Sequence, residues 1–247
     1  MTRLTLTPDL PPQTAALKRF ERTIEELNHF YWTFKCSLEF TLSHMAGSAM
    51  VPQVLSGQSA SHLNIPTAKF IADAPTTERF ARYSLLVHAV TTFEDYLKEV
   101  LSNFLVLNWK SDKTYKVSFR PEEIDPGADV QGWLRQRAVE GVVSEYLSRT
   151  YRKRFPAICT LLKEHGASCP TPSQATQDLA SAACEARNCI VHAAGVVDAR
   201  AERALASHIP GISIGTVLDV SEALLWQFLG ALRDSGRALD VEIRALV

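Results

Sequence analysis

Three polar residues, Arg187, Asn188 and His192, lie close together near the end of a segment with helical periodicity. A helix turns by about 100° per residue, so Asn188 and His192 lie one turn apart on one face, and the long Arg187 side chain lies on its flank. The apolar stripe of the segment lies nearly opposite and consists of Leu179, Ala183, Ala186, Ile190 and Ala193. We therefore expect a helix that presents an arginine, an amide and an imidazole away from its core.

These three side chains are suited to cleaving a phosphodiester. His192 lies in the last turn before Gly195, where the negative end of the helix dipole favours a protonated imidazole. A group that accepts and releases a proton near neutral pH needs such an environment. The guanidinium of Arg187 can hold a phosphate or stabilise the charge that develops on it. Asn188 is interpreted as catalytic support, and the alternative is a local cap. The pattern indicates metal-free cleavage of RNA, with the 2′-hydroxyl as nucleophile.

An arginine followed by a histidine after four to six residues is by itself a common pattern. It occurs three times in the chain, as Arg82 with His88, Arg187 with His192, and Arg203 with His208. Only the second pair has an asparagine after the arginine, a helix that ends in glycine just beyond the histidine, and an apolar stripe beneath. We therefore predict that His88 is structural and that His208 is a loop residue.

The run Arg187-Asn-x-x-x-His192, followed by Gly195 and Asp198, resembles the signature of HEPN-domain ribonucleases. Upstream, the segment 86–97 resembles the other core helix of that family with its acidic position. The resemblance covers residues from about 78 to 235. The chain is most similar to stand-alone HEPN proteins of toxin–antitoxin and phage-defence systems.

The resemblance implies a metal-independent endoribonuclease that needs no cofactor and leaves a 2′,3′-cyclic phosphate. It also implies a homodimer in which two Arg–His motifs form one composite cleft, and an antitoxin or another regulatory partner that restrains it. Two alternatives remain open. One is a non-catalytic HEPN-like module that binds RNA, a nucleotide or a partner protein as a scaffold. The other is a helical regulatory subunit that docks a partner.

Glu94 lies within the apolar stripe of its own helix, between Val90, Leu97 and Leu101. A carboxylate in such a position is costly unless it is paired. One interpretation is that Glu94 orients Arg187 in the active site. The alternative is a carboxylate at the rim of the core that another basic residue or a helix end satisfies. Asp95 points further outward, although the acidic position of the family is compatible with either residue.

The one dense basic run is a candidate RNA-binding segment and consists of Arg149, Arg152, Lys153 and Arg154, with Tyr151 and Phe155 between them. Basic side chains with interleaved aromatic rings suit an RNA backbone. The alternative is a solvated helix start. The four tryptophans are spread along the chain, and we expect no stacking platform from them.

The composition excludes several classes of protein. The chain has 247 residues, of which 46% are hydrophobic and 21% charged, so wholesale disorder is excluded. Because 26 Lys and Arg balance 27 Asp and Glu, a globally basic nucleic-acid coat protein is excluded too. Five cysteines without a C-x-x-C pair favour reduced thiols in a cytoplasmic protein over a disulfide framework or a zinc site. We expect no signal peptide and no membrane span.

Helical periodicity dominates the chain and predicts an all-α, HEPN-like helical bundle. Helices are expected at 13–46, 77–107, 129–148, 152–165, 173–194 and 219–246, the last with Gly236 as a candidate break. Residues 47–77 are expected to form a long irregular loop, 115–119 a short strand, and 211–218 a candidate β-hairpin. We expect one compact unit, with 1–77 as an N-terminal elaboration and 78–247 as the HEPN-like domain.

Overall fold

The chain folds as a bundle of helices. The computed structural model describes residues 13–45, 49–55, 58–109, 120, 129–167 and 172–244. Within these ranges every regular element is a helix, and the two β-bridges are isolated pairs. The prediction of an all-α fold is therefore confirmed.

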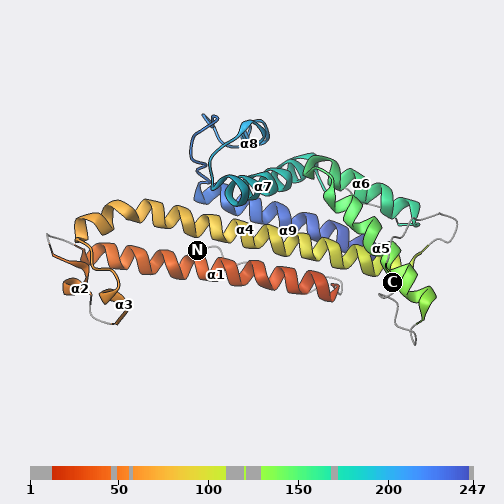
Figure 1. The fold of residues 1–247 in the computed structure, drawn as a ribbon, viewed down its shortest axis with the longest axis horizontal. Coiled ribbons are helices and arrows are strands. Elements are labelled where there is room, and N and C mark those ends of the chain that lie inside the picture. The colour runs from red at the N-terminus through yellow and green to blue at the C-terminus, as the bar shows by residue number, and fades with distance from the viewer. Residues whose placement is uncertain are drawn as a thin grey trace.

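Three long helices lie side by side and form the body of the molecule (Figure 1), namely α1 (Ala15–His44), α4 (Thr67–Leu107) and α9 (Glu222–Arg244). α1 runs antiparallel to α9. At the start of α1 the backbone N–H of Thr14 donates to Asp240 near the end of α9, over 3.2 Å. Further along α1, the hydroxyl of Tyr31 donates to Glu222 at the beginning of α9, over 2.9 Å. These two contacts fix the register of α1 against α9.

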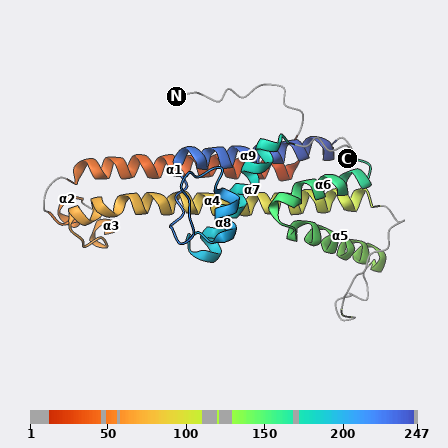
Figure 2. The same ribbon diagram turned by 90° about the horizontal axis from the view of Figure 1, so that it is seen from above.

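Six shorter helices complete the fold, namely α2 (Val51–Val54), α3 (Gln58–Ser61), α5 (Val130–Ser148), α6 (Tyr151–Glu164), α7 (Gln174–Ala193) and α8 (Ala199–Leu205). α2 and α3 lie at the end of the body where α1 leads into α4 (Figure 1). α7 lies across the body and packs on both α9 and α4 (Figure 2). The candidate catalytic helix is therefore held by the two long helices beneath it.

The end of α7 is fixed by a close approach to α4. Ala194 and Gly195 both adopt left-handed backbone conformations, with φ of 50° and 78°. A Cβ on Gly195 would lie 2.9 Å from the ring of Tyr83, so this position requires glycine. The Tyr83 hydroxyl also donates to the carbonyl oxygen of Leu218. The turn that carries His192 is thus anchored to a rigid part of the fold.

One hydrophobic core runs through the molecule. It includes Leu17 and Phe20 of α1, Leu97 and Phe104 of α4, and Phe228 of α9, all nearly inaccessible to solvent. α1 therefore packs into the same core as the helices that follow it. The division into 1–77 and 78–247 stays a prediction.

The bounds of most helices were predictable from periodicity. Four predicted helices are confirmed to within two residues at each end, those at 13–46, 129–148, 152–165 and 173–194.

The prediction of a long irregular loop over 47–77 is wrong. The range contains α2 and α3, and α4 begins at Thr67, ten residues before the predicted start. Pro75 lies inside α4, where a proline removes a backbone hydrogen bond and ordinarily ends a helix. Ala74 is buried here, and a cavity of about 280 Å³ between the two helices is lined by Ala74, Pro75 and Leu38 of α1. We infer that packing of α4 on α1 allows the helix to continue across Pro75.

Two further predictions near the C-terminus are wrong. Residues 211–218 form turns and no hairpin, and a single antiparallel bridge joins Val217 to Val196. α9 continues unbroken through Gly236, whose carbonyl accepts a 2.8 Å hydrogen bond from the Tyr96 hydroxyl. A Cβ at this glycine would lie 3.4 Å from Leu17, so the glycine permits close helix packing. α8 was not predicted, and the strand predicted at 115–119 lies outside the described residues.

One expectation about side chains is also wrong, and an unexpected aromatic contact is present. Cys159 takes part in a disulfide, so not all thiols are reduced, whereas Cys36, Cys184 and Cys189 are free. Trp32 and Trp226 come from different helices and stack on each other with ring centroids 5.9 Å apart, and the expectation that the tryptophans form no stacking platform for nucleic acid stays a prediction. Spacing along the sequence could not reveal either pairing, because each depends on how the helices pack.

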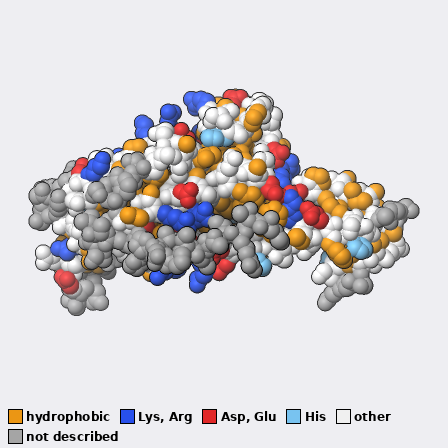
Figure 3. All heavy atoms as spheres, turned by 180° about the vertical axis from the view of Figure 1, so that it is seen from behind, with side chains coloured by type: hydrophobic (Ala, Val, Ile, Leu, Met, Phe, Trp, Pro, Cys, Tyr) orange, Lys and Arg blue, Asp and Glu red, His pale blue; other side chains and the backbone are white. Residues whose placement is uncertain are grey.

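The described surface carries mixed side chains. On the face shown in Figure 3, hydrophobic, basic and acidic groups are interspersed, in keeping with a net charge of −1. Among the described residues, no helix has the length and apolar character needed to cross a membrane.

Candidate active site

Arg187 and Asn188 are joined directly on α7. Arg187 Nη1 donates a 3.0 Å hydrogen bond to Asn188 Oδ1, and both side chains are partly buried. The two residues are adjacent in sequence and leave the helix about 100° apart, so the contact requires the arginine to curve around the helix surface. The predicted grouping of this guanidinium with this amide is therefore confirmed.

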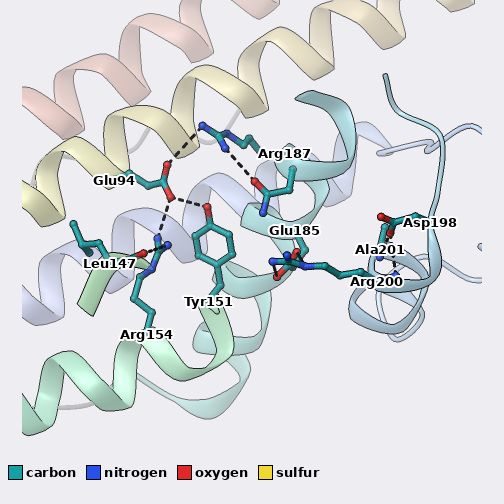
Figure 4. A network of polar contacts seen from close by, with 10 residues as sticks. Glu94, Leu147, Tyr151, Arg154, Glu185, Arg187, Asp198, Arg200 and Ala201 are labelled. Carbon is teal, nitrogen blue, oxygen red and sulfur yellow. Dashed lines mark hydrogen bonds and ion pairs between the residues drawn. The ribbon is translucent and has the colours of Figure 1, made fainter. Parts of the chain in front are cut away.

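Glu94 of α4 is the point at which three helices meet. Its Oε2 lies 3.7 Å from Arg187 Nη2 of α7. Its Oε1 lies 3.0 Å from Arg154 Nη1 and accepts a 2.6 Å hydrogen bond from the Tyr151 hydroxyl, both of α6 (Figure 4). Glu94 therefore pairs with Arg187 and is also satisfied by another basic residue, while its role in orienting Arg187 in an active site stays a prediction. We call Glu94, Tyr151, Arg154, Arg187 and Asn188 the carboxylate network.

Arg154 is buried, and its guanidinium is occupied by contacts in and beside this network. It is only 8% exposed, and besides Glu94 it donates through Nη2 to the carbonyl of Leu147. Its guanidinium also lies 4.0 Å from the centre of the Tyr151 ring. The prediction that Arg154 binds RNA is wrong, because its charge is turned inward and already paired.

Burial favours the neutral forms of Tyr151 in the network and of the neighbouring Cys184. Burial, the neighbouring Cys184 and the hydrogen bond to Glu94 all raise the pKa of Tyr151. Burial likewise raises the pKa of the Cys184 thiol, against a lowering effect of Arg154. Tyr151 therefore acts as a hydrogen-bond donor to Glu94, and Cys184 is unsuited to act as a nucleophile at neutral pH.

His192 lies one turn beyond Asn188 and is exposed. No hydrogen bond or ion pair joins its ring to another residue of the described part of the chain. Val191 and Val196 are 48% and 44% exposed on the same end of α7. The imidazole is thus open to an incoming molecule and bordered by apolar surface. Asp198, part of the motif in sequence, caps α8 by accepting from the backbone N–H of Ala201 over 2.7 Å.

One further acidic candidate and one histidine candidate lie in a separate groove. Asp95 and His88 are exposed on α4 and line a cavity of about 640 Å³ together with Ile190 and Ala194 of α7. The expected outward orientation of Asp95 is confirmed. Of the two neighbouring carboxylates, Glu94 is the one that contacts Arg187.

The other residues of the basic run are more accessible than Arg154. Arg149 pairs with Glu145 over 3.0 Å and lies 4.3 Å from the ring of Tyr146. Arg152 and Lys153 are exposed at the start of α6. These three residues remain candidates for RNA binding.

Comparison with known proteins leaves the site to be argued from its own geometry. No family model, no curated protein and no solved structure matches the chain. In the described ranges, no three or more His, Cys, Asp and Glu side chains group closely enough to hold a metal ion.

Sequence reasoning missed the role of Tyr151 and Arg154 in holding Glu94. A signal was present, because Tyr151, Arg154, Phe155, Ile158 and Leu162 follow the spacing of one helix face. All five are buried in the structure. An arginine in phase with such a stripe is directed towards the core, where it needs a carboxylate.

Proposed function

We propose that the protein is a metal-independent endoribonuclease of HEPN type, whose active site is built from Arg187, Asn188 and His192 of α7 with Glu94 of α4. The observation that carries the proposal is the arrangement of the carboxylate network. Glu94 and Asn188 hold the Arg187 guanidinium from two sides, and His192 is exposed one turn away. A cation held in place on the same helix as an accessible imidazole is suited to phosphodiester cleavage.

The proposed reaction is an internal transfer at phosphorus. His192 takes the proton from a ribose 2′-hydroxyl, and the oxygen attacks the adjacent phosphorus. The bond to the 5′-oxygen of the next nucleotide breaks, and that oxygen receives a proton from a second imidazole or from water. The products are a 2′,3′-cyclic phosphate and a 5′-hydroxyl. Arg187 stabilises the additional negative charge on the phosphate during this step.

A homodimer is part of the proposal. The exposed Val191 and Val196 provide apolar surface around His192. A two-fold contact pairs the same patch of both subunits, so it would bring both His192 side chains towards one phosphate. A toxic ribonuclease further implies a partner that restrains it, and a role in toxin–antitoxin or antiviral defence. Its RNA targets imply action in the cytoplasm.

A modified substrate tests this function. An RNA oligonucleotide with a mapped cleavage position is compared, in EDTA, with the same oligonucleotide carrying one 2′-deoxynucleotide on the 5′ side of the scissile bond. We expect cleavage at that bond to fall to background, and the all-RNA substrate to yield a 2′,3′-cyclic phosphate. Equal cleavage of both would contradict 2′-hydroxyl attack. RNA that is bound but never cut would favour the non-catalytic alternative.

A further inference from the structure

A second hollow lies on the outer side of α7. The cleft between the start of α6, α7 and α8 has a volume of about 930 Å³. Three arginines line it, Arg152 of α6 and Arg200 and Arg203 of α8. Two of the three do not belong to the basic run found in the sequence. Their convergence depends on α8 folding back onto α7.

The arginines of this cleft differ in their availability to a ligand. Arg200 is held by Glu185, with hydrogen bonds of 2.8 and 2.7 Å from Nε and Nη2 (Figure 4). Arg203 uses Nε to donate to the carbonyl of Ala199 over 3.0 Å, and its Nη groups bond no other described residue. Arg152 is exposed and likewise has no ion pair within the described chain. Arg152 and Arg203 therefore offer unneutralised guanidinium groups to an anion.

The cleft continues on both sides. Arg152 also lines a second hollow of about 600 Å³ along α6, together with Arg149 and Lys153. At the other end, Glu185 of α7 forms part of the cleft wall. Asn188 follows Glu185 by three residues and His192 follows Asn188 by four, so both continue the same face of the helix. His192 therefore lies about two turns beyond Glu185, on the face of α7 that borders the cleft.

We propose that the cleft between α6, α7 and α8 is the track along which a single strand of RNA reaches the active site. This inference rests on the proposed function. The basic groups are spread along two hollows that share Arg152, rather than gathered around one point, which suits a chain of phosphates better than a single phosphate. Polar side chains between the arginines can contact ribose and base edges, and these are Ser181, Ser207 and Gln227. Ribose hydroxyls are characteristic contacts in RNA recognition.

Binding measurements on a non-cleaving protein test the track. A fluorescein-labelled, unstructured 20-nucleotide RNA is titrated with the His192→Ala protein in EDTA at several salt concentrations, and anisotropy is measured. Adding Arg152→Ala and Arg203→Ala together is expected to weaken binding at least about tenfold. The slope of log K against log salt should also fall by about 1.4, because each phosphate contact to a single strand contributes about 0.7.

A matched control has two basic residues removed elsewhere. Arg22 and Lys69 are exposed, and each belongs to a surface pair with a carboxylate four residues on. Arg22→Ala with Lys69→Ala should leave binding within about twofold. Asp178→Asn, which removes a negative charge from the cleft wall, should strengthen binding.

The outcomes distinguish a failure of the proposed RNA track from a failure of the proposed ribonuclease function. Undiminished binding by the Arg152→Ala, Arg203→Ala protein would overturn the track and leave the proposed function intact. Failure of the His192→Ala parent to bind any RNA would overturn both. Displacement of the RNA by ATP at comparable phosphate concentration would identify a small-nucleotide site and contradict the track.

Discussion

Cleavage of RNA by the Arg187→Ala variant is expected to be about 100- to 1000-fold slower than by the wild type, the loss found when one transition-state donor is removed. Arg187 Nη1 lies 3.0 Å from Asn188 Oδ1, and Arg187 Nη2 lies 3.7 Å from Glu94 Oε2. The guanidinium is therefore fixed in place before substrate binds. Initial rates with a labelled RNA in EDTA give the effect. The melting temperature should change little, because Glu94 keeps its contacts with Tyr151 and Arg154.

Two companion variants sharpen this prediction. Arg187→Lys keeps the positive charge but lacks the planar fork that contacts two groups at once, so we expect it to restore only a small part of the rate. Arg22→Ala, on the exposed surface of α1, should cut RNA as the wild type does. An Arg187→Ala protein with a rate within threefold of wild type would show that this guanidinium takes no part in the chemistry.

Replacing Arg154 by methionine is expected to lower the free energy of unfolding by about 3 kcal/mol. The substitution removes the closest cation of Glu94, a hydrogen bond to the Leu147 carbonyl and the contact with the Tyr151 ring. Removing one partner of a buried ion pair costs about 3–5 kcal/mol, and the partly exposed Glu94 places this case at the lower end. For a chain of this size the melting temperature should fall by about 6–12 °C.

The neighbouring Arg152 supplies the control for this stability measurement. It is exposed on the same helix, so Arg152→Met should change the free energy of unfolding by no more than about 0.5 kcal/mol. Thermal and urea unfolding of the two variants are compared side by side. Equal stability of the two would mean that the carboxylate network does not hold α4, α6 and α7 together.

Local sequence patterns predicted most of the helices. They failed at positions where packing between helices overrides the local preference of a residue. The bounds of α5, α6 and α7 follow from their apolar periodicity and from the residues that flank them. Gly236 was predicted as a candidate break, and Pro75 is of a residue type that ordinarily ends a helix, yet both lie inside continuous helices. Pro75 is accommodated by packing on α1, and Gly236 is where Tyr96 and Leu17 come closest to α9. Such compensation depends on partners far away in sequence.

The candidate site was predictable where its parts share a helix. The proximity of the Arg187 and Asn188 side chains follows from helix geometry. Glu94 could be singled out because it is a carboxylate within an apolar stripe. Arg154 was assigned to the wrong partner, because charge in a basic run was given more weight than its phase with the buried face of α6. The cleft beside α7 was not predictable, because α8 itself was not. Contacts between helices, unlike contacts within one, leave little trace in a single sequence.

The most direct test of the account is RNA cleavage in EDTA by the wild type and by His192→Ala. His29→Ala, which removes an exposed histidine of α1, serves as the matched control. We predict that the wild type and His29→Ala cut a labelled tRNA or mRNA at the same positions and rates, and that His192→Ala does not cut. Cleavage by His192→Ala at the wild-type rate would contradict the assignment of the active site to α7.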